Sequence, residues 1–351
     1  MALIFKVNVE TAGKDGCYRI TWQDKQTDKQ EFFNSSAADL SQDELEHLWF
    51  RKEFQFSIGE KLFRFLDGDR RFLEQAVSEG QAKDERVILQ LYLYRETANW
   101  PFELLANEKG FLLVNRVHLV RCVSDWGKGK ESKRENRPLK LIFMACSALD
   151  VEPELDFEKE EEAIVEVTEN LPMDIEVEDS GSLAGLGEKL LHTCYDVVHL
   201  SGHAGIDEKG RPIFVMEDEL GYCDEVDAGA LWNKALKLNP PRVLFLSGCR
   251  TGQSPASSKV LGGVGTLSQR GLRPPAKKAI RAIARGADWR PADSRISSRT
   301  GETDTLSANF SMSFAGSIAE LERVPIVLGW GRPVSDMQAM AAAEVFYREL
   351  S

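Results

Sequence analysis

Four short apolar runs after residue 138 constrain the fold of this chain more than any other feature. These runs are LKLIFMAC (139–146), YDVVHL (195–200), RVLFLS (242–247) and PIVLGW (325–330). A run of this length that is apolar at nearly every position is typical of a strand covered on both faces. Helical patterns lie between the runs, and a last one closes the chain at 336–350. This alternation predicts an α/β fold, a mostly parallel sheet with helices on both faces.

The residues before this pattern predict a smaller α+β region. Leu3–Val9 and Tyr18–Trp22 predict an opening hairpin, and RVILQLYLY (86–94) alternates as a half-buried strand does. We also expect two short strands at Phe111–Val114 and Val117–Val123. The polar stretch GKGKESKRENR (127–137) indicates a linker. The sequence therefore predicts an N-terminal region at 1–137 and a core at 138–351.

Composition and cysteine usage exclude several classes of protein. Hydrophobic residues make up 42% and charged residues 28%, as in an ordinary globular protein. No stretch approaches eighteen consecutive apolar residues, which argues against a membrane span. The N-terminus, MALIFKVNVET, lacks a basic region and a cleavage site, so we expect a strand there and a cytoplasmic protein. The six cysteines and five histidines show no metal-ligand spacing, so we predict free thiols, no metal and no cofactor.

Charge is spread unevenly along the chain. The net charge of −12 disfavours general nucleic-acid binding, yet residues 270–299 carry nine Lys/Arg against two Asp, a local charge of +7. This segment is interpreted as a solvated loop. Contact with an acidic partner surface, or with nucleic acid through 270–299 alone, stays open. The acidic run from Glu152 to Asp179 is interpreted as a solvated helix face.

Two loops carry residues suited to nucleophilic catalysis. His203 follows the second apolar run in HLSGHAG, and Cys249 follows the third in LSGCRTG. Ligands of open α/β sheets bind beyond the carboxyl ends of the strands, so neighbouring strands would bring the two side chains together. An imidazole can take the proton of a thiol, whose ordinary pKa of about 8.5 leaves little thiolate at neutral pH. We predict the backbone amides of Cys249 and Ala204 as the oxyanion hole.

The same residues resemble a known family. HLSGHAG resembles the histidine motif of caspases and metacaspases, and SGCRTG is similar to their nucleophile motif. The layout resembles the CHAT domain, a caspase-like group. The likeness extends to NWPFELL (99–105), GFLLVNRVHLVR (110–121), VLGWGRPVSD (327–336) and AEVFYREL (343–350). The resemblance implies a caspase-like fold and peptide-bond hydrolysis by a dyad of His203 and Cys249. It also implies a role in a bacterial defence or cell-death system under a sensor protein.

The resemblance further suggests where a protein substrate would bind. The loop after the fourth apolar run lines the groove in caspase relatives, which makes Trp330 and Arg332 candidates. Metacaspases carry an acid two residues before the cysteine, where this chain has Ser247. This difference weakens the case for cleavage after basic residues, and Asp150 remains a candidate for a negative charge.

The resemblance lapses at 266–305, a basic loop insertion at the position of the intersubunit loop that caspases cleave. Rich in Arg, Ser, Pro and Gly, it is expected to be readily cut.

Two other functions remain open. One is a catalytically silent CHAT-like module that binds or assembles proteins. The other is a different cysteine hydrolase, for which a G-x-C-x-G elbow is expected. SGCRTG departs from that elbow because Arg250 and Thr251 separate the cysteine from the next glycine. His199, within its strand, is expected to have a structural or supporting role.

Overall fold

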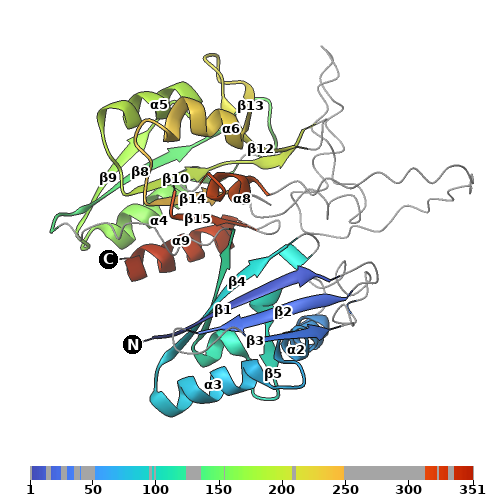
Figure 1. The fold of residues 1–351 in the computed structure, drawn as a ribbon. Helices are drawn as coiled ribbons and strands as arrows, with labels where there is room; N and C mark the ends of the chain where they lie inside the picture. Colours follow the sequence, from blue (N-terminus) through green and yellow to red (C-terminus); the bar gives the residue numbers. More distant parts are fainter. Residues whose placement is uncertain are drawn as a thin grey trace, which may run out of the picture. The chain divides into compact units, whose positions relative to one another are not determined.

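A computed structural model describes residues 2–12, 17–24, 30–34, 40, 52–94, 97–98, 100–123, 136–153, 155–207, 211–248, 313–321, 324–330 and 336–350. The chain forms two compact units, Met1–Lys130 and Glu131–Ser351 (Figure 1). No helix of the described residues is both long and apolar enough to cross a membrane.

Unit 1 is built on a mixed five-stranded sheet. Its strands are β1 (Ala2–Thr11), β2 (Tyr18–Gln23), β3 (Gln30–Asn34), β4 (Arg86–Leu93) and β7 (Val117–Cys122), in the order β3-β2-β1-β4-β7. β1 pairs antiparallel with β2, as the predicted opening hairpin requires. The central pairs β1–β4 and β4–β7 are parallel.

One face of this sheet is covered by α2 (Lys52–Asp67) and α3 (Phe72–Lys83) (Figure 1). Alternate strand residues point into that layer, among them Val7, Val9, Leu89 and Leu91, all fully buried. The strict alternation of β4 therefore corresponds to one buried face, as the sequence indicated. The predicted strand at Phe111–Val114 is wrong for most of its length. Only β6 (Gly110–Phe111) pairs, with β5 (Ala106–Asn107), and the 3₁₀ helix η3 (Leu112–Asn115) follows, after the 3₁₀ helix η2 (Phe102–Leu104) earlier in the chain.

Gly59 lets α2 approach the turn that follows β4 closely. A Cβ atom at Gly59 would lie 2.0 Å from the carbonyl oxygen of Leu104 and 2.9 Å from the Cβ of Ala106. Because backbone atoms cannot move aside cheaply, Gly59→Ala is expected to destabilise unit 1 by about 1–3 kcal/mol. Thermal denaturation of this variant should be compared with Arg64→Ala, at an exposed position of the same helix. Equal melting temperatures for the two variants would contradict the close packing.

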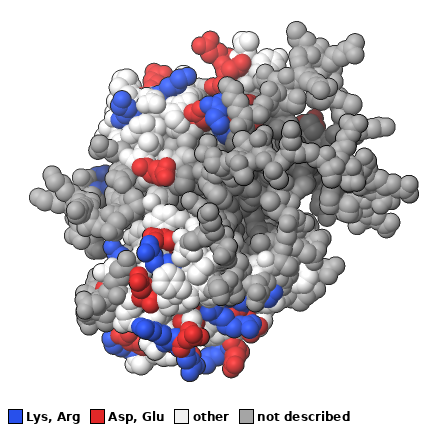
Figure 2. All heavy atoms as spheres, turned by 45° about the vertical axis from the view of Figure 1, so that its right-hand side comes forward, with Lys and Arg blue, Asp and Glu red and all other residues white. Residues whose placement is uncertain are grey.

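The described surface mixes acidic and basic side chains. Figure 2 shows Lys and Arg interspersed with Asp and Glu on the face it presents. Several charged side chains of the described residues form exposed pairs, such as Lys83 with Glu79 at 2.6 Å and Arg121 with Glu103 at 2.6 Å. Pairs of this kind contribute little to stability and are typical of a solvated surface. The basic segment 270–299 lies outside the described residues.

Unit 2 contains the parallel sheet that the apolar runs predicted. Its strands are β8 (Leu139–Ala145), β9 (Met173–Glu178), β10 (Val197–Ser201), β14 (Val243–Ser247) and β15 (Ile326–Gly329), in the order β15-β14-β10-β8-β9. Every pair in this sheet is parallel. β10 is the central strand, with β8 on one side and β14 on the other.

Helices cover both faces of this sheet, which confirms the predicted α/β fold class (Figure 1). On one face lie α5 (Leu183–His192), α6 (Ala228–Leu231) with its π-helical continuation η4 (Trp232–Leu236), and α8 (Phe314–Ala319). On the other face lie α4 (Phe157–Thr168) and α9 (Asp336–Leu350). Successive residues alternate between the two layers. Val198 and Leu200 of β10 pack toward α5, whereas Val197 packs toward α9.

A buried carboxylate joins the amino ends of three strands in unit 2. Asp196, 4% exposed, accepts two hydrogen bonds from the guanidinium of Arg137, at 2.6 and 3.1 Å, and one from the backbone amide of Lys140. Its backbone carbonyl accepts from the amides of Arg242 and Val243, each at 3.0 Å. This cluster fixes the starts of β8, β10 and β14 at the edge opposite to the predicted catalytic loops.

A second, three-stranded sheet follows β10 in the chain. It consists of β11 (Ala204–Ile206), β12 (Pro212–Glu217) and β13 (Cys223–Asp227), paired antiparallel. Ile213, Phe214, Val215 and Met216 of β12 are each at most 1% exposed. The β12–β13 hairpin is therefore part of the core of unit 2.

Candidate functional site

The two strands that lead to His203 and Cys249 are neighbours. β10 and β14 pair in parallel with Ser201 opposite Ser247, the last residue of each strand. The ladder continues one residue further, because the amide of Gly202 donates to the carbonyl of Ser247 at 3.2 Å. His203 stands two positions after Ser201, and Cys249 stands two positions after Ser247. The chain therefore leaves the sheet at the same level on both strands. Cys249 itself lies outside the described residues.

His203 is half-buried and oriented by a backbone group. Its Nε2 atom lies 2.8 Å from the carbonyl oxygen of Pro153, in the loop between β8 and α4. A carbonyl oxygen can only accept, so Nε2 carries a proton, and the lone pair of the neutral ring is on Nδ1. The carbonyl of His203 accepts from the amide of Val215 at 2.8 Å. Loop and hairpin contacts together fix this histidine beyond the end of β10.

A buried carboxylate, that of Glu160, lies next to these strand ends. The sequence predicts that this residue belongs to a solvated helix face. Glu160 of α4 is 6% exposed and accepts hydrogen bonds from Ser201 and from Ser247, the latter at 2.8 Å. Burial alone would raise the pKa of Glu160. The contact with His199 and the two serine hydrogen bonds outweigh it, so the pKa lies below its ordinary value. The interpretation of the acidic run as a solvated face is wrong for Glu160 and for Glu178, which is 5% exposed.

Helical spacing could have revealed Glu160. It stands three residues after Phe157 and four before Ile164, on the same apolar stripe of α4. His199 is fully buried in β10, and its Nδ1 atom lies 2.8 Å from the hydroxyl of Tyr347 in α9. This agrees with the expected structural or supporting role for His199.

The predicted substrate residues have different surroundings. Ser247 is 6% exposed, with its hydroxyl directed at Glu160. Asp150 is exposed in the loop after β8 and accepts a hydrogen bond from the amide of Cys223 at 2.8 Å, which joins that loop to β13. Trp330 follows β15 and packs edge-on against Phe245, with ring centroids 6.3 Å apart.

Of the other predicted site features, some are described by the structure and some are not. Ala204 begins β11 and pairs with Phe214. Arg332 and the insertion 266–305 fall outside the described part of the chain. Within that part, no group of three or more His, Cys, Asp or Glu side chains is arranged to hold a metal ion.

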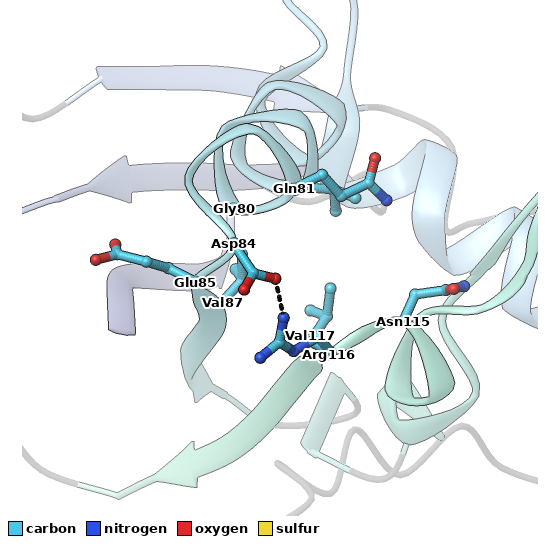
Figure 3. Close-up of a pocket in the computed structure, with 9 residues that line it drawn as sticks. Gly80, Gln81, Asp84, Glu85, Val87, Asn115, Arg116 and Val117 are labelled. Carbon is cyan, nitrogen blue, oxygen red and sulfur yellow. Dashed lines mark hydrogen bonds and ion pairs between the residues drawn. The ribbon is translucent and has the colours of Figure 1, made fainter. Parts of the chain in front are cut away.

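Unit 1 contains a separate hollow of about 160 Å³ between α3, β4 and β7 (Figure 3). Asp84 and Arg116 form an ion pair at its mouth, and both side chains are more than half exposed. The residues that line it are Val77, Gly80, Gln81, Asp84, Glu85, Val87, Asn115, Arg116 and Val117. None of them is a cysteine, serine or histidine, so this hollow lacks the thiol and the imidazole that the sequence predicts for the site. The carboxyl edge of the unit 2 sheet is therefore the candidate functional site.

Comparison with known families gives a result that agrees with this geometry. The family model described as CHAT domain matches residues 59–274. The chain belongs to the CHAT domain family. The match begins within α2 and covers β4, β8, β10 and β14, so it includes both loops of the candidate site. The segments at 327–336 and 343–350, which resemble the end of CHAT proteins, lie beyond the matched residues.

The CHAT domain is a caspase-like family of protease type. No curated protein is significantly similar to this chain. Within the CHAT match, the parallel pair β10–β14 and the orientation of His203 are the features on which a functional proposal can be based.

Proposed function

We propose that this CHAT domain protein is a cysteine endopeptidase with Cys249 as nucleophile and His203 as general base. The observation that carries the proposal is the in-register pairing of β10 with β14. Because Ser201 and Ser247 end their strands side by side, residues two positions further on start from adjacent points of one edge. Family membership supports the reaction class, and the pairing of the two strands supports a shared location for these two residues.

The hydrogen bond from His203 Nε2 to the carbonyl of Pro153 supports the role of base. It holds the neutral ring in the tautomer whose lone pair is on Nδ1, so Nδ1 is the atom that accepts the thiol proton. It also stabilises the imidazolium that forms, since the Nε2 proton retains an acceptor. The carbonyl of Pro153 thus orients the base, a role that a third residue plays in other nucleophile–base pairs.

The proposed reaction takes place in two halves. Nδ1 of His203 takes the proton from Sγ of Cys249, and the thiolate attacks the carbonyl carbon of the scissile peptide bond. The amides of Cys249 and Ala204 stabilise the oxyanion. The C–N bond then breaks as His203 returns the proton to the leaving amine, leaving an acyl-enzyme thioester. Water, deprotonated by the same Nδ1, hydrolyses the thioester and regenerates the thiol.

The proposal includes a protein substrate bound along the same edge, with Asp150, Trp330 and Arg332 as groove residues. Ser247, which the sequence also offered as a substrate residue, is buried with its hydroxyl on Glu160 and is not included in the groove. The proposal also includes cytoplasmic location and control by a sensor protein in a bacterial defence or cell-death system. These parts follow from the family resemblance of the sequence.

The test is a proteome-wide cleavage profile. The purified chain is incubated with a cell lysate, and new protein N-termini are labelled and identified by mass spectrometry. Wild-type protein is expected to generate a set of new N-termini that Cys249→Ala does not generate. The matched control is Cys194→Ala, which removes an exposed free thiol of the same unit and should preserve the profile.

Identical profiles for wild type and Cys249→Ala would overturn the assignment of the nucleophile. A wild-type protein that generates no cleavage would favour the silent CHAT-like module that binds or assembles proteins.

A further inference from the structure

Glu160 is an acid that the proposed reaction does not use and that the fold nevertheless buries. Its buried side chain lies on the face of the sheet covered by α4 and α9. A buried carboxylate is costly unless it is paired and hydrogen-bonded. Its partners therefore show what keeps it there.

Two of these partners are the last residues of β10 and β14. The hydroxyl of Ser247 donates to Oε1 at 2.8 Å, and the hydroxyl of Ser201 donates to Oε2. An ionised carboxylate only accepts, so both serines are donors. A single carboxylate thus bridges the ends of the two strands that lead to His203 and Cys249.

A second layer holds the carboxylate in place. His199 Nε2 lies 3.4 Å from Glu160 Oε1, a distance longer than that of a strong hydrogen bond. His199 Nδ1 lies 2.8 Å from the hydroxyl of Tyr347, and the two rings stack with centroids 5.9 Å apart. Burial opposes ionisation, but the contact with His199 and the hydrogen bonds from Ser201 and Ser247 keep the pKa of Glu160 below its ordinary value, so the side chain is ionised at neutral pH. The ionised carboxylate of Glu160 therefore offers about four lone pairs to the two hydroxyl donors, Ser201 and Ser247.

We propose that Glu160 is a positioning residue that fixes the ends of β10 and β14 at one level and so sets the distance between the thiol and the imidazole. The inference rests on the proposed function for its catalytic consequence. The physical reason is that proton transfer and thiolate attack depend steeply on geometry, so that a displacement of about 1 Å can cost about 10²-fold in rate. Glu160 contacts Ser201 and Ser247 and acts through them.

Three substitutions test the bridge on the full chain with a peptide substrate taken from the cleavage profile. Glu160→Gln keeps the shape of the side chain but leaves one acceptor oxygen for two hydroxyls. It is expected to lower kcat by about 10²-fold and to change KM by less than about threefold. Ser201→Ala and Ser247→Ala each remove one of the two hydrogen bonds to Glu160, and each is expected to lower kcat about tenfold. Glu162→Gln, exposed on the same helix, is the control and should match wild type.

A second measurement separates positioning from general stability. The rate of alkylation of Cys249 by iodoacetamide is measured against pH by mass spectrometry of its peptide. In wild type, a thiol held beside an imidazole reacts below its ordinary pKa. In the three variants the profile is expected to move toward that of a free thiol, whereas destabilisation without a change at the site would leave it in place.

The outcomes are distinct. Wild-type kcat and an unmoved alkylation profile in Glu160→Gln and both serine variants would overturn the positioning role. If Glu160→Gln does not fold, the serine variants, which remove only one hydroxyl each, decide the matter. If wild-type protein shows no cleavage that depends on Cys249, the proposed function fails, and the alkylation profiles alone still support or overturn the bridge.

Discussion

Replacing His203 with alanine is expected to lower kcat/KM for a cleaved peptide by a factor of about 10²–10⁴, the usual contribution of a positioned general acid–base group. The loss follows because Nδ1 no longer accepts the thiol proton or returns it to the leaving amine. The pH profile should change as well. In wild type, the activity rises with the formation of the thiolate–imidazolium pair, whereas the variant should need a pH near the ordinary thiol pKa of about 8.5.

His192→Ala provides the control for this prediction. His192 is exposed in the last turn of α5, in the same unit, and carries the same functional group. It should retain wild-type kcat/KM and pH dependence. Steady-state kinetics of the three proteins between about pH 5 and 9 would settle the comparison, and a His203→Ala variant with wild-type rates would exclude this residue as the base.

Replacing Asp196 with alanine is expected to produce the largest loss of stability, about 3 kcal/mol for unit 2. The substitution removes a buried acceptor from the guanidinium of Arg137 and from the amide of Lys140. The side chain of Arg137 is about a third exposed, so water can solvate part of its charge in the variant. The loss of stability is therefore expected at the lower end of the range for breaking a buried ion pair. For a unit of this size the melting temperature should fall by about 6–12 °C. Asp174→Ala, at an exposed position of β9, is the control.

The contribution of Asp196 should also depend on pH in a defined direction. Burial alone would raise the pKa of Asp196, but the hydrogen bonds from Arg137 and Lys140 and the charge of Arg242 lower it overall. A carboxyl whose folded pKa is depressed contributes stability above its unfolded pKa, about 3.9, and this contribution is lost as pH falls through the folded pKa. Denaturant titrations should therefore show a full difference between wild type and Asp196→Asn at pH 7 and a shrinking one below about pH 4. A constant difference across that range would show that Asp196 is not the ionised partner of Arg137.

Much of this architecture could be predicted from local patterns. The runs at 139–146 and 242–247 are apolar because helices cover both faces of their strands. Neither face is exposed to solvent, so apolar and polar residues do not alternate along these strands. The strict alternation of β4 likewise marks a sheet with one buried face. The sequence made neighbouring strands the condition for a joint site of His203 and Cys249, and β10 and β14 are neighbours.

Partners that are distant in sequence could not be found in this way, even where helical spacing marks a residue such as Glu160 as part of a buried stripe. Glu160 is buried because Ser201, Ser247 and His199 compensate its charge, and these partners belong to two strands of the sheet. An acidic residue in an acidic helix gives no local sign of such partners. Similarly, the short segment after Phe111 has the apolar composition of a strand, yet Leu112 packs into the core of unit 1 from a 3₁₀ turn. The composition of this segment predicts that it is apolar and packed, but it does not distinguish a strand from a 3₁₀ helix.

The in-register end of β10 and β14 has a consequence for how CHAT chains of this kind can change length. Because side chains alternate along a strand, an insertion or deletion of one residue between Asp196 and His203 would turn the imidazole to the opposite layer and carry Ser201 away from the α4 side. The same holds between Arg242 and Ser247 for the hydroxyl of Ser247, which points to Glu160. Variation in length is compatible with this site only outside these two stretches, so an engineered graft of a new substrate loop should begin after the cysteine and leave both strand spacings intact.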